Sequence, residues 1–143
     1  MTLYIDADAC PVVDIALGAC KDYQIPVVLV CDVNHVMQRE GAQTLYVEKG
    51  SDSADLRIAN LAGKGDIVLT QDYGLAALAL ARGAKALNQN GLIFTADNID
   101  ALLLSRHTAA RIRRGGGRLK GPPKRTPDMD DAFLGALTKL LSA

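Results

Sequence analysis

The sequence has no long apolar run, and its start lacks the features of a secretion signal. No stretch approaches the roughly 18 consecutive apolar residues that a membrane span requires. The first residues, MTLYID, carry neither a basic flank nor a long apolar core, so they do not resemble a signal peptide. We therefore expect a cytoplasmic protein that has no membrane partner.

Paired cysteines are also missing. Cys10, Cys20 and Cys31 are odd in number and form no CxxC pair, which argues against a disulfide framework and a zinc knuckle. Neither His35 nor His107 is placed by the sequence to act as a base for Cys10. We therefore interpret Cys10 as a small buried thiol rather than as a nucleophile.

Acidic residues are absent from one segment, although the net charge of the chain is zero. Residues 106–125 contain eight basic residues and no acidic one, so the rest of the chain is acidic. One interpretation is that this segment binds the phosphate backbone of a nucleic acid, which requires no sequence preference. The other is that it is a solvated charged face. Few aromatic residues interrupt the segment, so base stacking is not expected there. Gly116 and Gly121 have P-loop spacing, but Pro122 and Pro123 stand where Lys and Ser/Thr are needed, which excludes a P-loop.

The 143 residues are enough for one domain with a single core, and we expect residues 1–143 to form it. Residues 106–126 are a basic, Gly- and Pro-rich segment within this domain, and 115–125 are expected to be a mobile loop. Apolar patterns predict strands at 2–6, 26–31, 43–47, 67–70 and near 84–88. They predict helices at 11–23, 54–62, 74–82, from about 99 into the basic segment, and 127–141, with Pro11 in the first turn of the first helix. This alternation indicates an α/β fold with a parallel sheet.

Acids follow two of the predicted strands. The stretch IDADACPVVD places Asp6 and Asp8 at the end of the first strand, and Asp72 follows the fourth. In open α/β sheets, ligands bind outside the carboxyl ends of the strands, so these three acids are expected at one edge. Asp52 and Asp55 are three residues apart at a helix start and can share one face.

Carboxylates held close together repel one another, by roughly 4 kcal/mol for a pair about 4 Å apart at an effective dielectric near 20. They must either take up protons or bind a cation. Oxygen ligands without histidine favour Mg²⁺ or Mn²⁺ over Zn²⁺, and such a metal can activate water for attack on a phosphoryl group. The alternative is structural, because each acid could instead cap a helix or complement a helix dipole.

Several motifs resemble the YaiI/YqxD family of uncharacterised bacterial proteins. In chain order they are IDADACPV (5–12), SDSADLRI (51–58), DIVLTQDYGLAALAL (66–80), NID (98–100), RHTAARIRRGGG (106–117) and KGP (120–122). The resemblance covers almost the whole chain, and the first and third motifs are long enough to be specific.

That family is similar to PIN-domain proteins, in which three or four acids bind Mg²⁺ or Mn²⁺ and RNA is cleaved. The resemblance implies a three-layer α/β/α PIN-like fold with a central, mostly parallel sheet of about five strands. It also implies that Asp6, Asp55 and Asp72 are the catalytic acids. Asp8 is implied to support them, so the expected metal ligands are Asp6, Asp8, Asp55 and Asp72.

We therefore expect a Mg²⁺- or Mn²⁺-dependent ribonuclease that hydrolyses phosphodiester bonds, with RNA as its partner. A homo-oligomer is compatible with the sequence but not indicated by it. The residues expected to contact the substrate are Thr70, Tyr73, Arg113, Arg114, Arg118 and Lys120.

Two other functions are compatible with the same residues. In a phosphatase of the haloacid-dehalogenase type, Asp6 would be the nucleophile and IVLT (67–70) would supply the second motif. Such enzymes have a hydroxyl residue two positions after the second acid, where this chain has Cys10. In a non-catalytic protein, residues 106–125 would bind RNA or a protein, and the acids would hold a structural ion or none.

Overall fold

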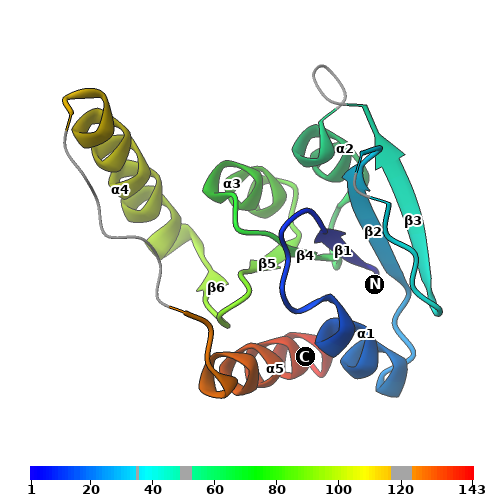
Figure 1. Cartoon of the computed structure of the whole chain (residues 1–143). Helices are drawn as coiled ribbons and strands as arrows, with labels where there is room; N and C mark the ends of the chain where they lie inside the picture. Colours follow the sequence, from blue (N-terminus) through cyan, green and yellow to red (C-terminus); the bar gives the residue numbers. More distant parts are fainter. Residues whose placement is uncertain (35, 49–52, 117–123) are drawn as a thin grey trace.

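The computed structural model describes residues 1–34, 36–48, 53–116 and 124–143, without the side chains of residues 106–110 and 113. Within these residues, six strands form a central sheet, and five helices cover its two faces (Figure 1). A helix that could span a bilayer is absent from this part of the chain.

The sheet has the strand order β3-β2-β1-β4-β5-β6. Neighbouring strands from β3 to β5 run parallel, and β6 is antiparallel to β5. The prediction of an α/β fold with a mostly parallel sheet is confirmed, while the described residues contain one strand more than the five expected. The strands are β1 (Leu3–Asp6), β2 (Val27–Asp32), β3 (Ala42–Val47), β4 (Ile67–Leu69), β5 (Lys85–Leu87) and β6 (Ile93–Phe94).

Helices form the two outer layers. On one face, Phe133 and Leu137 of α5 share a buried cluster with Leu3 and residues of α1. On the other face, residues of α2, α3 and α4 pack together with Val68 of β4. Figure 1 shows the same division, with α1 and α5 below the sheet and α2 and α3 above it. The helices are α1 (Val13–Asp22), α2 (Ala54–Leu61), α3 (Tyr73–Ala81), α4 (Ala96–Arg114) and α5 (Pro127–Leu141).

The side chains of the two central strands alternate between these layers, as the two-residue period of a strand requires. In β1, Leu3 and Ile5 belong to the cluster of α1 and α5, whereas Tyr4 packs against the opposite cluster. In β4, Leu69 faces α1 and α5. The register pairs Ile5 with Leu69. The next residues, Asp6 and Thr70, are therefore neighbours on the side of α2 and α3.

Helix α1 begins later than the sequence predicts. Its first residue is Val13, so Pro11 lies in the preceding turn and not in the first turn of the helix. The reason is a tight turn after β1: Ala9 has the left-handed φ of 60°, and the Cys10 N–H donates to the Ala7 carbonyl at 3.1 Å. Residues 11 and 12, which the helical pattern assigned to the first turn of the helix, follow as a further turn before Val13.

Helix α4 extends into the basic segment. Near its N-terminus, Ile99 is buried against α3, whereas Leu104 is 65% exposed. The helix runs on to Arg114 and ends in a turn where Gly116 has φ 85°. Of the predicted loop 115–125, residues 117–123 lie outside the described residues.

Candidate active site

The candidate site lies where the chain changes direction along the sheet. From β1 the chain continues outward to β2 and β3, and it then returns to the other side of β1 to form β4. Open α/β sheets form their ligand crevices at such a point, beyond the carboxyl ends of the two central strands. Asp6 is the last residue of β1, and Thr70 directly follows β4.

Thr70 connects the ends of the two strands. Its side chain is buried, with 2% exposure, and its Oγ1 donates a hydrogen bond to Asp6 Oδ2 at 3.0 Å. The same Oγ1 accepts from the backbone N–H of Asp72 at 3.0 Å. A buried hydroxyl that is bonded on both sides has little rotational freedom, so Thr70 orients the Asp6 carboxyl relative to the start of α3.

Asp72 is the N-cap of α3. Its Oδ1 accepts from the backbone N–H groups of Gly74 at 2.8 Å and Leu75 at 3.4 Å. The structural alternative for this residue, a helix cap, is therefore confirmed. The same position puts a carboxylate at the positive end of a helix dipole and close to Asp6, so the capping role is compatible with a role in the site.

Asp8 lies in the turn after β1 and reaches the neighbouring strand. Its Oδ2 accepts from the backbone N–H of Asp32, the last residue of β2, at 3.1 Å. The alternative that Asp6 and Asp8 cap the first helix is wrong, because the N-cap of α1 is Val12, which makes no side-chain cap bond. Asp8 instead joins the turn to β2.

Asp55 enters the site from the first turn of α2. The hydroxyl of Ser53, the N-cap residue, donates to Asp55 Oδ1. Asp52, the other acid predicted for this helix start, lies outside the described residues.

The four acids share one electrostatic environment. Burial is the largest cause that raises the pKa of Asp6 from 3.8 to about 6, against the lowering effect of the Thr70 hydrogen bond. The charges of Asp8, Asp72 and Asp55 raise this pKa further. Acids from a strand end, two loops and a helix start are thus close enough for their charges to act on one carboxyl. That they form a common metal site stays a prediction.

The donor chemistry of these acids suits a hard cation, but they do not form a ready cage. No three His, Cys, Asp or Glu side chains of the described residues are arranged to hold a metal ion between them. Mg²⁺ rarely requires such a cage, because it keeps several waters and commonly uses one or two carboxylates together with phosphate oxygens of the substrate. The residues therefore fit Mg²⁺ or Mn²⁺ in charge and ligand type.

The predicted substrate contacts have different surroundings. The ring of Tyr73 packs edge-on against Phe94, with 5.8 Å between ring centroids and 68° between planes. Arg114 is exposed at the end of α4. Arg118, Lys120 and the side chain of Arg113 lie outside the described part of the chain. That these residues and Thr70 contact the substrate stays a prediction.

Two features of the turn after β1 were not predicted. Ala9 adopts a left-handed conformation, which L-residues other than Gly, Asn and Asp rarely do, and nothing in its side chain signals this. Gln71, between Thr70 and Asp72, donates from its side-chain amide to the Ala9 carbonyl at 3.0 Å. This hydrogen bond joins the loops after β1 and β4, and only the folded arrangement reveals it.

Cys10 lies beside the acids, and its thiol is partly buried. Burial is the main cause that raises its pKa, with a smaller contribution from the charge of Asp6. A thiol with a raised pKa stays protonated and is a poor nucleophile at neutral pH. This agrees with the interpretation of Cys10 as a small buried thiol.

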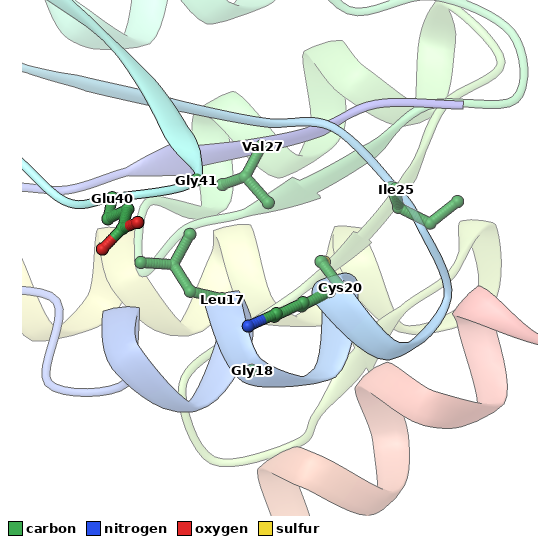
Figure 2. A pocket seen from close by; sticks show the side chains of 8 residues that line it. Leu17, Gly18, Cys20, Ile25, Val27, Glu40 and Gly41 are labelled. Carbon is green, nitrogen blue, oxygen red and sulfur yellow. The ribbon is translucent and has the colours of Figure 1, made fainter.

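Two cavities lie at opposite edges of the sheet. The larger, of about 390 Å³, lies between the C-terminal half of α1 and the starts of β2 and β3, far from the acids (Figure 2). Leu17, Ile25 and Val27 line it, and Glu40 lies at its side. The smaller cavity, of about 210 Å³, is lined in part by Ala9 and Gln71 and so adjoins the acids.

Comparison with known proteins gives a consistent family assignment. Residues 4–143 match the family described as "Uncharacterized BCR, YaiI/YqxD family". A UPF0178 protein of Exiguobacterium sibiricum is 51% identical over 142 residues, covering 99% of this chain and 97% of that protein. A UPF0178 protein of Ruminiclostridium cellulolyticum is 47% identical over 137 residues, covering 96% and 90%. No solved structure gives a significant match. The chain belongs to the YaiI/YqxD family of uncharacterised bacterial proteins.

Proposed function

We propose that this protein is a Mg²⁺- or Mn²⁺-dependent ribonuclease that hydrolyses phosphodiester bonds in single-stranded RNA. The observation that carries the proposal is the convergence of Asp6, Asp8, Asp55 and Asp72 at the carboxyl edge of the sheet, where their charges and burial raise the pKa of Asp6 to about 6. The repulsion that the neighbouring charges exert on the Asp6 carboxylate costs free energy, and a bound cation would reduce that cost.

The proposed roles follow from the positions of the side chains. Asp6, Asp55 and Asp72 would hold one or two cations, and Asp8 would bind a water of the hydrated ion. When bound, the metal supplies an activated water and the positive charge that stabilises the phosphoryl oxygens. Thr70 keeps the Asp6 carboxyl oriented, because its hydroxyl bonds both Asp6 and the Asp72 N–H.

The charge of the chain supports RNA as the substrate class. The basic segment starts in the C-terminal half of α4, where Arg111 and Arg114 are exposed. Arginines on one projecting helix provide a surface for phosphates beside an acidic body.

Substitution of two acids tests the proposal. Asp6→Asn and Asp72→Asn keep the shape of the side chains, and each should abolish Mn²⁺-dependent cleavage of a single-stranded RNA oligonucleotide. The same change at Asp100, which is exposed on α4, is the matched control and should leave cleavage intact. Cleavage that survives in both site variants contradicts the proposal.

Metal binding gives a second measurement that does not depend on turnover. Carboxylates bind cations in the deprotonated form, so protons compete with the metal. Because the pKa of Asp6 is raised to about 6, the affinity for Mn²⁺ measured by calorimetry should fall as the pH drops below this value. An affinity that is the same at pH 5 and pH 8 would argue against Asp6 as a ligand.

One observation favours a second candidate, a phosphatase with Asp6 as nucleophile. The hydroxyl of Thr70, which directly follows β4, donates to Asp6 Oδ2 at 3.0 Å and lies where a phosphate on Asp6 would need a hydrogen-bond donor. Beryllium fluoride forms a stable aspartyl-phosphate mimic on such a nucleophile. A trapped adduct on Asp6, seen by fluorine NMR, would support this candidate, and its absence would remove it.

A further inference from the structure

The smaller cavity borders the two loops that carry Asp8 and Asp72. It has a volume of about 210 Å³ and lies between the turn after β1, the loop after β4, the turn between β5 and β6, and α5. Ala9 in its wall follows Asp8 in the chain, and Gln71 lies between Thr70 and Asp72. A polymer bound with a phosphate at the acids would cross these two loops to place a base in this cavity.

The lining of the cavity combines amide groups with apolar walls. Gln71, Gln89 and Asn90 contribute side-chain amides, and Pro11 and Met129 contribute apolar surface. An amide carries a donor and an acceptor side by side, which matches the edge of a nucleobase, whereas apolar walls suit its ring faces. The Gln71 amide nitrogen already donates to the Ala9 carbonyl, and Asn90 Oδ1 already accepts from Arg125. The described lining contains no acidic residue, so the cavity differs in chemistry from the adjoining acids.

One acceptor in this wall lacks a donor. The side-chain oxygen of Gln89, Oε1, is buried and has no hydrogen-bond partner in the described part of the chain. Buried acceptors are nearly always paired, so an orphaned one calls for an explanation. The terminal torsion of a glutamine is soft, and a small rotation would turn this oxygen toward a group bound in the cavity.

The wall around Gln89 is held in place by Arg125. The three guanidinium nitrogens donate to Asp130 Oδ1, Asn90 Oδ1 and the Gln89 carbonyl, each at 2.7 Å. In the same turn, Asn88 Oδ1 accepts from the backbone N–H groups of Asn90 and Leu92 at 2.9 Å. A wall fixed by five hydrogen bonds is pre-organised, which lowers the entropy lost when a ligand binds.

We propose that this cavity is a nucleobase subsite that favours adenine, and that Gln89 Oε1 accepts a hydrogen bond from its exocyclic amino group. Amide side chains pair with adenine because its amino donor lies next to a ring-nitrogen acceptor. The inference rests on the proposed function in one respect, since it takes the bound polymer to be RNA. It adds that the enzyme selects the base next to the phosphate that it cleaves.

Adenosine and inosine monophosphates provide the test, because they differ at the amino group that Gln89 is proposed to bind. We expect the wild-type protein to bind the adenosine nucleotide about tenfold more tightly than the inosine nucleotide in calorimetric titrations, the discrimination typical of one good base contact. Gln89→Leu should remove this difference. Gln43→Leu, the same change at an exposed position on β3, is the matched control and should retain it.

The outcomes separate this inference from the ribonuclease proposal. Equal binding of the two nucleotides, no binding of either, or a preference that persists in Gln89→Leu would overturn the subsite, even if RNA is cleaved. A preference that Gln89→Leu removes would support it, even if Asp6→Asn shows that no cleavage depends on the acids. If circular dichroism shows that leucine disturbs the fold, Gln89→Met provides a second variant with a flexible chain of similar length.

Discussion

Asp6 is the residue whose environment differs most from that of an exposed acid. Burial and the charges of Asp8, Asp72 and Asp55 raise its pKa from 3.8 to about 6. A carboxyl with a raised pKa binds its proton more tightly in the folded than in the unfolded chain, so the free energy of unfolding falls as the pH rises from 3.8 to about 6. After a reduction for its partial exposure, we expect this loss to be about 2 kcal/mol.

Asp6→Asn should remove this loss. Asparagine stays neutral and keeps an oxygen that can accept from Thr70, so the variant should be about 2 kcal/mol more stable than wild type at pH 8. The difference should shrink toward zero near pH 4, where Asp6 is protonated in the folded wild-type protein. Urea unfolding at both pH values measures this, and Asp100→Asn should show no such trend. A difference of the same size at both pH values would contradict the raised pKa as its cause.

A divalent cation should act in the opposite direction at the same residue. If Asp6 holds the metal, saturating Mg²⁺ at pH 8 stabilises the wild-type protein by mass action and leaves Asp6→Asn unchanged. Thermal unfolding of the wild-type protein and of Asp6→Asn, each with and without Mg²⁺, measures this difference. Equal stabilisation of both proteins would place the cation elsewhere.

For single residues, the sequence predicted the positions of the acids better than their hydrogen-bond partners. Asp6, Asp8 and Asp72 were recognisable because an acid directly after an apolar strand must lie at the sheet edge. The bond from Ser53 to Asp55 and that from Gln71 to Ala9 were not, because a side chain's hydrogen bonds depend on rotamers and on loops that meet only after folding. The sequence around Asp72 allowed both a helix cap and a metal ligand, and it did not distinguish between the two roles.

Among the elements, the short turn between β5 and β6 is held by close contacts with its neighbours. Gly91 in this turn has φ 86°, and a Cβ added there would lie 2.5 Å from the Ala132 carbonyl oxygen of α5. Backbone atoms cannot move aside as a flexible side chain can. The turn and α5 are thus in direct contact, and Arg125 adds hydrogen bonds to both.

Substitution of two glycines separates backbone strain from this overlap. Gly65 has nearly the same φ, 88°, but a Cβ there meets nothing within 4 Å. Gly65→Ala should therefore cost only the left-handed conformation, about 1 to 2 kcal/mol. Gly91→Ala should cost that amount plus the displacement of the turn from α5, about 1 to 3 kcal/mol more. Chemical unfolding measures both, and equal losses would show that the contact with α5 gives way easily.

The sequence predicted the long helices and strands, but it missed the short strand β6 and the exact start of α1. Strands such as β2 can be recognised in the sequence by a nearly continuous run of apolar residues rich in valine. Strand β6 has only two residues, too few to show a period, and it forms because it can pair with β5. The start of α1 was predicted too early because Pro11 fits the first turn of a helix and a loop equally well. In the structure the turn at Ala9 precedes it, and Pro11 lies in the loop.

For the molecule as a whole, the main electrostatic feature is the separation of charge along the chain. Eight of the 16 basic residues fall within residues 106–125, and all 16 acidic residues lie outside them. Helix α4 carries the first of these cations away from the sheet, as Figure 1 shows for its far end. The sequence predicted this separation, and the structure shows that a helix supports the first part of it.

RNA binding should therefore depend strongly on salt. If phosphates contact the end of α4, replacing Arg111 and Arg114 with Ala should weaken RNA binding and lower the slope of log affinity against log salt by about 2. The variant Lys21→Ala/Lys139→Ala removes the same charge from exposed positions on α1 and α5, and its slope should be unchanged. Fluorescence anisotropy in EDTA measures binding without cleavage. Equal slopes for the two double variants would exclude α4 as the RNA surface.

The position of α5 also bears on when the protein can fold during synthesis. Phe133 and Leu137 complete the buried cluster beneath β1, and Asp130 anchors the arginine that fixes the β5–β6 turn. In a nascent chain that has left the ribosome only as far as α4, α1 alone covers this face, and the part that α5 covers is exposed to water. The acids after β1 and β4 can meet before that, but the β5–β6 turn beside the smaller cavity is fixed only after residues 127–141 have emerged. A base subsite in that cavity would therefore be complete only after the last helix of the chain has been made.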